Sequence, residues 1–162
     1  MRFVMRQKLF AITDDYNIAD ANEQDVYYVD GKLLSLGKNL SFQDMERREL
    51  AHIQQKLLNW GPTYEVTHNG ELVAVVKKEL FTLFHCVFHV DEPGHEALTA
   101  EGNFSDHEYV FTRAGQRVAS VSKQWFTFAD TYGVDVSDGE DPVLILACTV
   151  VIDEACHGDR NR

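Results

Sequence analysis

The chain has 162 residues, 44% of them hydrophobic and 11% aromatic, which is enough to bury a core and excludes an intrinsically disordered protein. Its net charge of −11 and isoelectric point near 4.9 argue against nucleic-acid binding and disfavour adhesion to anionic membranes through overall charge. The three cysteines lack disulfide spacing, and we find no secretory signal, so we predict a cytoplasmic protein. No apolar run approaches about 20 residues, so we predict no transmembrane segment.

The first ten residues, MRFVMRQKLF, alternate in side-chain character as a β-strand requires. Arg2, Arg6 and Lys8 fall on one face of this strand, while Met5 and Gln7 fall on the other. Side chains two residues apart share a face of a strand. The segment therefore predicts an N-terminal strand with a basic stripe along one side.

The next predicted unit is a hairpin around Asp30-Gly31. Aromatic and β-branched residues occupy 26–29, the segment 32–36 with three leucines follows, and Asp-Gly tolerates the positive φ angles of a tight turn. We interpret this unit as a degenerate copy of two units further along the chain. In that alignment its Leu33, Lys38 and Phe42 fall near the positions of Leu72, Lys77 and Phe81.

Residues 45–58, MERRELAHIQQKLL, are compatible with two structures. Their composition favours a helix, and Leu50, Ile53 and Leu57 recur at helical spacing. Their place between hairpins favours a strand, because β pairing overrides a weak helical propensity. We predict a strand here, with a helix as the alternative.

The central part of the chain nearly repeats itself. The segment from Tyr64, YEVTHNGELVAVVKKELFT, matches the segment from Tyr109, YVFTRAGQRVASVSKQWFT, without a gap, and nine of nineteen positions are identical. Unrelated segments of this length share about one. Each copy has a turn signal at its sixth and seventh positions, Asn69-Gly70 in the first and Ala114-Gly115 in the second. The repeat predicts two equivalent β-hairpins within a chain of hairpins.

The last predicted element differs from the others. Asp141-Pro142 is a helix-start signal, and residues 143–152, VLILACTVVI, are apolar on every side. Ten such residues span about 15 Å as a helix, half the hydrocarbon core of a bilayer. We predict a buried helix near 142–157, threaded through a β-barrel, with one more buried strand as the alternative. Residues 1–157 are predicted to form a single domain, and 158–162 a disordered tail.

Four segments, in this order, resemble the LURP-one-related family: FVMRQKLFAITDDYNI, ELAHIQQKLLNWGPTYEV, GELVAVVKKELFTLF and the terminal apolar stretch. That family belongs to the tubby C-terminal-like superfamily, which includes the phospholipid scramblases. The resemblance implies a mostly β fold, a closed antiparallel barrel of about twelve strands around a central hydrophobic C-terminal helix. It also implies a binding role, since tubby domains bind phosphoinositides through basic side chains on the barrel wall.

His85, Cys86 and His89, with His95 nearby, suggest a metal site, but strand geometry argues against one. His85 and His89 share a strand face yet lie about 13 Å apart, too far for one ion with ligands at about 2 Å, and Cys86 points to the other face. Cys148 lies in the apolar helix and is expected to be an inert thiol.

Other catalytic signals are missing from the sequence. Cys156 and His157 are adjacent helical residues, which do not face each other. The chain has no phosphate-binding glycine loop, nucleophile elbow or zinc-ligand pair. We therefore expect no catalytic, cofactor-binding or metal-binding residues.

Basic side chains are the stronger functional candidates. Lys78 and Lys123 occupy the same place in the two repeats. If repeated strands lie near one another, these lysines could converge with Arg113 or Arg117 on a phosphorylated headgroup or an acidic peptide. Alternatively, strand lysines protect sheet edges and cover apolar wall. The candidate anion-binding residues are Arg2, Arg6, Lys8, Lys77, Lys78 and Lys123.

These observations predict a non-enzymatic binding or scaffold module that docks an anionic lipid headgroup, another small ligand or a protein. The alternative is an enzyme with acid–base groups at an open barrel mouth, which a histidine within hydrogen-bond reach of a carboxylate would favour. A surface for self-association is a third interpretation. We expect a monomer or weak oligomer with no cofactor and no nucleic-acid partner.

Overall fold

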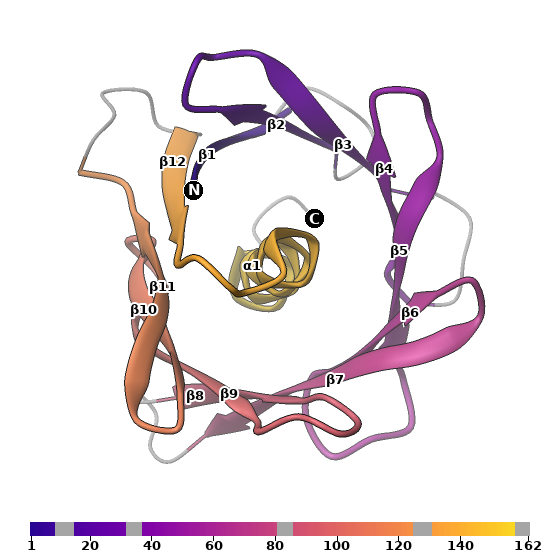
Figure 1. The fold of residues 1–162 in the computed structure, drawn as a ribbon. Coiled ribbons are helices and arrows are strands. Elements are labelled where there is room, and N and C mark those ends of the chain that lie inside the picture. Colours follow the sequence, from indigo (N-terminus) through magenta and orange to yellow (C-terminus); the bar gives the residue numbers. More distant parts are fainter. Residues whose placement is uncertain (9–14, 32–36, 81–85, 125–130, 158–162) are drawn as a thin grey trace.

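The computed structural model describes residues 1–8, 15–31, 37–80, 86–124 and 131–157. Within these ranges, twelve antiparallel strands close into a barrel, and one helix runs through its centre (Figure 1). The elements are β1 (Arg2–Gln7), β2 (Tyr16–Asp20), β3 (Asp25–Gly31), β4 (Asn39–Asp44), β5 (Glu49–Lys56), β6 (Thr63–His68), β7 (Glu71–Leu80), β8 (Cys86–Asp91), β9 (Leu98–Asn103), β10 (Glu108–Arg113), β11 (Gln116–Ser122), β12 (Thr131–Val136) and α1 (Pro142–His157). This architecture confirms the predicted fold class.

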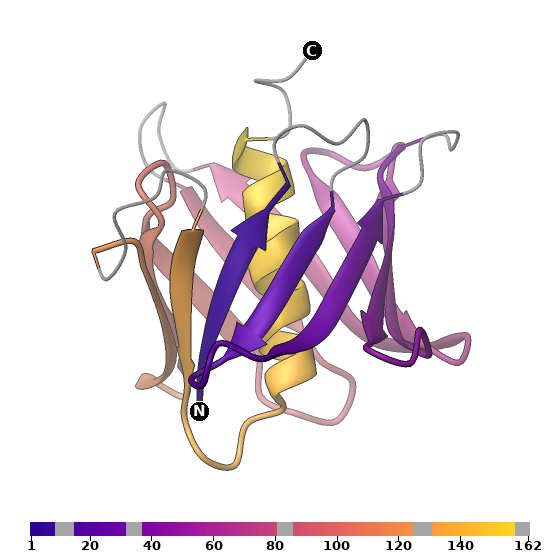
Figure 2. The ribbon, with the colours of Figure 1, turned by 90° about the horizontal axis from the view of Figure 1, so that it is seen from above.

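The barrel closes because β12 returns to β1. Each strand pairs antiparallel with its neighbour in sequence, and the register Phe3↔Val134 and Met5↔Tyr132 joins the last strand to the first. A closed barrel leaves no free sheet edge. The odd-numbered strands run toward the end where α1 has its C-terminus, which we call the upper end. Met1 and the start of α1 lie at the lower end (Figure 2).

The two repeats form equivalent hairpins, as predicted. β6–β7 turns at Asn69-Gly70 and β10–β11 at Ala114-Gly115, and all four residues have positive φ. Each hairpin also has a β-bulge at the matching place, after Val66 in the first and after Phe111 in the second. Because β8 and β9 separate the two hairpins, one repeat covers four of the twelve strands.

The turn predicted at Asp30-Gly31 is wrong. Both residues belong to β3 and pair with β4, and the N–H of Gly31 donates to Asp15 Oδ1 at 3.0 Å, so no turn forms there. The strand predicted at 32–36 lies outside the described residues. By position in the barrel, the counterpart of the two repeats is β2–β3, four strands before β6–β7, with its own bulge after Ile18.

Residues 45–58 contain a strand rather than a helix, as predicted. The strand is β5, which begins at Glu49. Ala51 and Ile53 are buried, whereas Leu50 on the opposite face is half-buried. This period of two follows from hydrogen bonding to β4 and β6 on both sides, which outweighs the helical propensity.

The predicted buried helix is confirmed. Asp141 caps α1, because its Oδ1 accepts a 2.9 Å hydrogen bond from the N–H of Val143. Every residue from Leu144 to Ile152 is buried, so inward side chains of the strands cover the helix on all sides. No helix among the described residues is long and apolar enough to cross a bilayer. The tail predicted at 158–162 lies outside the described residues.

We expect Leu146→Ala to lower the free energy of unfolding by about 2–5 kcal/mol, because it leaves a cavity around a fully buried side chain. Leu80→Ala is the matched control: Leu80 is 67% exposed, and we expect a change below about 0.5 kcal/mol. Urea unfolding followed by circular dichroism measures both. Equal losses in the two variants would contradict an enclosed helix.

Candidate functional site

The last turn of α1 carries two buried carboxyl groups at the upper end of the barrel. Asp153 and Glu154 are only 3% and 5% exposed. A helix C-terminus is the negative end of the helix dipole, and burial removes water, so both effects disfavour a carboxylate there. The barrel wall must therefore supply hydrogen-bond donors and positive charge.

Three side chains from the wall meet these carboxyl groups. The hydroxyl of Tyr16, at the start of β2, lies 2.7 Å from Asp153 Oδ2 and 2.8 Å from Glu154 Oε1. His107 Nε2 lies 2.7 Å from Asp153 Oδ1. Lys38 Nζ lies 3.0 Å from Glu154 Oε2. We call Tyr16, Lys38, His107, Asp153 and Glu154 the inner polar cluster.

The number of hydrogens at Tyr16 constrains this cluster. A tyrosine hydroxyl has one hydrogen, so Tyr16 donates to only one of its two carboxyl neighbours at a time. The hydroxyl therefore lies between the two carboxyl groups and links Asp153 to Glu154 through Tyr16.

One group of side chains has the residue types of a metal site: His107, Asp153 and His157. Each offers one candidate ligand atom, and these three atoms lie within 4.8 Å of one another. The rings of His107 and His157 stack with centroids 4.7 Å apart and an angle of 8°, so their nitrogen lone pairs lie in parallel planes rather than converge. His157 Nε2 also donates to the carbonyl oxygen of Phe104 at 3.0 Å. We interpret this group as a hydrogen-bonded stack.

Among the described residues, no other histidine or cysteine joins His107, Asp153 and His157 in a group that could hold a metal ion. His89 Nε2 lies 2.6 Å from Glu79 Oε2 on the barrel wall, and His85 lies outside the described residues. Cys148 is completely buried, and burial raises the pKa of its thiol, as expected for an inert group. Burial also raises the pKa of Cys156 to about 11, so its thiol is not an activated nucleophile.

The basic residues proposed from the sequence do not form one site. By position they are Arg2 and Arg6 in β1, Lys8 after it, Lys77 and Lys78 in β7, and Lys123 after β11. β1 and β7 lie six strands apart in a ring of twelve, on opposite sides of the barrel. Arg113 and Arg117 flank the lower turn of β10–β11, whereas the repeat lysines lie toward the upper end. The predicted convergence of these groups does not occur.

Several of these cations already have partners. Arg2 Nη2 lies 2.8 Å from Asp135 Oδ2, and Lys77 Nζ lies 3.8 Å from Asp91 Oδ2. Lys8 Nζ lies 5.0 Å from the ring centroid of Tyr28. These contacts agree with the alternative interpretation, in which strand cations cover the barrel wall.

The lysines are nevertheless distributed unevenly along the barrel axis. Six of the seven lysines of the chain lie in the described residues, and each is in the upper half of its strand or just beyond its upper end. They are Lys8, Lys38, Lys56, Lys77, Lys78 and Lys123. Of the six described arginines, only Arg6 lies toward the upper end. The upper end is therefore the lysine-bearing end.

The upper end also exposes large apolar side chains. The β5–β6 connection and the end of β7 lie side by side there, because the N–H of Lys78 donates to the carbonyl of Pro62 at 3.0 Å. The exposed fractions are 57% for Leu57, 99% for Leu58, 103% for Trp60 and 67% for Leu80. We call these four residues the upper rim.

Sequence reasoning missed the inner polar cluster because its members are far apart in the chain; His107 and Asp153, for example, are 46 residues apart. One signal for it is present in the repeat. Each of the three equivalent hairpins has a buried tyrosine two residues before its bulge; the three are Tyr16, Tyr64 and Tyr109. Correct alignment of the first copy would have indicated three inward tyrosines at matching places.

Comparison with known proteins supports this architecture over nearly the whole chain. The family model described as LURP-one-related matches residues 1–153. The chain is 30% identical to the uncharacterised protein YxjI of Bacillus subtilis strain 168 over 157 residues, which covers 97% of this chain and 94% of that protein. The X-ray structure of the Arabidopsis thaliana protein AT5G01750 superposes with a TM-score of 0.71 at 16% identity, covering 99% of this chain and 92% of the other.

Tyr16→Phe should lower the free energy of unfolding by about 2–3 kcal/mol, because the buried carboxyl groups lose the hydroxyl between them. Tyr132→Phe is the matched control, since Tyr132 is also buried but its hydroxyl has no hydrogen-bond partner among the described residues. We expect a change below about 1 kcal/mol there. Urea denaturation at neutral pH compares the two, and similar losses would show that the cluster does not depend on Tyr16.

Stability should also fall at alkaline pH. Burial raises the pKa of Tyr16, Tyr109 and Tyr132 well above the usual tyrosine value. Unfolding exposes these hydroxyls, which then ionise near pH 10, so this contribution is complete below about pH 10 and is lost as the pH rises toward the folded-state pKa values. Absorbance at 295 nm should show these three of the six tyrosines ionising only as the chain unfolds. Ionisation of all six in the folded protein near pH 10 would contradict this.

Proposed function

We propose that this chain, which belongs to the LURP-one-related family, is a binding module whose upper rim docks on anionic lipid membranes. The observation that carries the proposal is the full exposure of Leu58 and Trp60 at the lysine-bearing end. Clustered apolar side chains with this exposure are typical of a contact surface. Tryptophan in particular favours the bilayer interface, where its ring is apolar and its N–H stays hydrated.

Apolar contact and charge attraction act together in this arrangement. Removal from water stabilises a leucine or tryptophan side chain by roughly 1.5–3 kcal/mol. A lysine near an anionic bilayer contributes about 1 kcal/mol. Lys78 and Lys123 form no ion pair with a described residue. Leu58, Trp60 and these two lysines together contribute roughly 5–8 kcal/mol before the cost of immobilisation, which suits reversible peripheral binding.

The net charge of −11 does not oppose this orientation strongly. The sixteen residues of α1 span about 24 Å, so carboxylates at the lower end lie more than two Debye lengths from the upper rim at physiological salt. Their repulsion by an anionic surface is therefore largely screened. Around the upper rim itself, in the upper halves of β5, β6 and β7, the cations Lys56, Lys77 and Lys78 outnumber the carboxylates Glu65 and Glu79.

The enzymatic alternative has one observation in its favour, the 2.7 Å contact between His107 Nε2 and Asp153 Oδ1. Both side chains are largely buried, at 13% and 2% exposed. Asp153 is also committed to Tyr16, and the contacts together neutralise the C-terminal end of α1. We therefore assign this pair a structural role.

Vesicle co-sedimentation tests the proposal. Wild-type protein should bind vesicles of phosphatidylcholine that contain phosphatidylserine and should bind pure phosphatidylcholine vesicles weakly. The double variant Leu58→Ser/Trp60→Ser should bind the anionic vesicles at least about tenfold more weakly, because two inserting side chains are lost. Its urea midpoint should equal that of the wild type, since both side chains are fully exposed.

Leu72→Ser is the matched control. Leu72 is 46% exposed but lies at the lower end of β7, so vesicle binding should be unchanged. Failure of the wild type to bind anionic vesicles would refute the proposal, as would full binding by the double variant. A dimer seen by sedimentation velocity that the double variant abolishes, without vesicle binding, would identify the upper rim as a self-association surface instead.

A further inference from the structure

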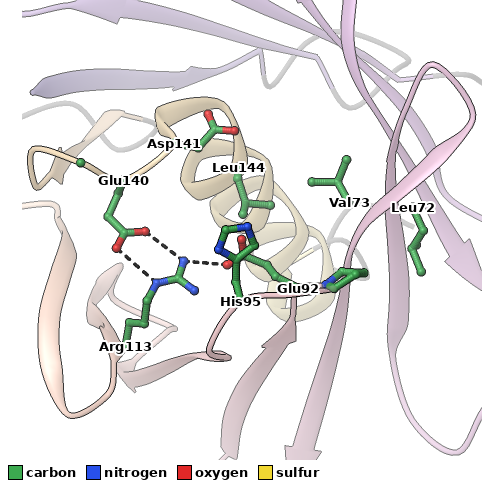
Figure 3. Close-up of a pocket in the computed structure, with 10 residues that line it drawn as sticks. Leu72, Val73, Glu92, His95, Arg113, Glu140, Asp141 and Leu144 are labelled. Atoms are coloured by element: carbon green, nitrogen blue, oxygen red, sulfur yellow. Dashed lines mark hydrogen bonds and ion pairs between the residues drawn. The ribbon is translucent and has the colours of Figure 1, made fainter.

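Two adjoining cavities lie at the lower end of the barrel, between the start of α1 and the wall. Figure 3 shows the residues that line the larger one. The larger has a volume of about 500 Å³ and the smaller about 300 Å³. Val73, Asp141 and Leu144 line both, so we treat the cavities together as the lower cleft. Its size is that of a small-molecule site.

The smaller cavity is mainly apolar. Aliphatic side chains of β5, β6 and α1 form its wall, among them Leu50, Val66 and Val143. A hydrocarbon segment placed there leaves water and needs no hydrogen-bond partner. This part of the lower cleft therefore favours the apolar body of a ligand.

Charge is concentrated in the larger cavity. Glu92, Glu140 and Asp141 line it together with Arg113. Arg113 Nη2 lies 2.6 Å from Glu92 Oε1 and 2.9 Å from Glu140 Oε2, and its Nη1 donates to the backbone carbonyl of Glu96. Figure 3 shows the guanidinium held between the two glutamates. Three carboxylates and one guanidinium thus line the larger cavity, and Arg113 is already occupied.

Asp141 is the carboxylate common to both cavities. Its Oδ1 accepts the N–H of Val143 and so offsets the helix N-terminus. The helix dipole contributes about half a positive charge there, less than the excess of carboxylate. The lower cleft therefore favours a cation over an anion.

We propose that the lower cleft binds a small organic cation, a protonated amine on an apolar chain. The ammonium group lies beside Asp141, and the chain occupies the smaller cavity. The paired Glu92, Arg113 and Glu140 form the polar wall opposite. This site is independent of the upper rim, which lies at the other end of α1.

Three ligands of equal length test the charge preference: octylammonium, octan-1-ol and octanoate. Isothermal titration of the whole chain should show saturable binding of octylammonium. Octanol should bind at least about tenfold more weakly, because it lacks the ion pair, and octanoate should not bind. Octanoate binding as tight as that of octylammonium would overturn the proposal.

Asp141→Asn separates charge from helix capping, because asparagine caps a helix as well as aspartate does. The variant should bind octylammonium about three- to fivefold more weakly, because Asp141 is exposed and an exposed ion pair contributes up to about 1 kcal/mol, and its melting temperature should be unchanged. It should bind anionic vesicles like the wild type. Unchanged affinity for octylammonium in this variant would refute the role of Asp141 and with it the proposal.

Val73→Phe tests the place of the apolar chain, since Val73 lines both cavities and a larger side chain fills them. Val118 occupies the same position in the second repeat and does not line the lower cleft, so Val118→Phe is the matched control. Octylammonium binding should be lost in the first variant and kept in the second. Equal binding by both would place the ligand elsewhere. If Val73→Phe does not fold, the asparagine variant still decides the outcome.

Discussion

The enclosure of α1 is the constraint on which the rest of the structure depends. A helix that is apolar on every side is stable in water only when other side chains surround it, and a closed ring of strands surrounds it without leaving an edge. Because the helix fills the barrel, the interior offers little space for a ligand along most of its length. Sites for binding are left at the two ends of α1 and on the outer wall.

The two ends of α1 differ in the groups that satisfy their backbone and side-chain charges. At the lower end, Asp141 caps the first turn and the wall stands away from the helix, which leaves the lower cleft. At the upper end, Asp153 and Glu154 are buried against the negative end of the dipole and are held by Tyr16, His107 and Lys38. The buried polar groups at the upper end therefore stabilise the fold. A partner there can contact only the upper rim and the lysines around it.

Local patterns in the sequence were sufficient for the main elements. The turn dipeptides at Asn69 and Ala114 need positive φ, and the uniform apolar run of residues 143–152 needs enclosure, so both features are set by neighbouring residues alone. Asp30-Gly31 shows where this reasoning fails. The same dipeptide continues β3 as a strand because β4 pairs with it and Asp15 accepts the N–H of Gly31, and both contacts depend on the whole barrel.

The sequence by itself determined that a repeated hairpin would build an antiparallel barrel around a C-terminal helix, because periodicity, turn residues and helix capping act over a few residues. Only the tertiary structure decided which distant groups meet. Closure of β12 onto β1 places the basic residues of β1 opposite those of β7. In the closed barrel, Tyr16 contacts the last turn of α1. Leu58 and Trp60 stay in solvent although their residue types favour burial. These outcomes depend on strand order and register around the ring, which sum contributions from the entire chain and cannot be read from any one segment.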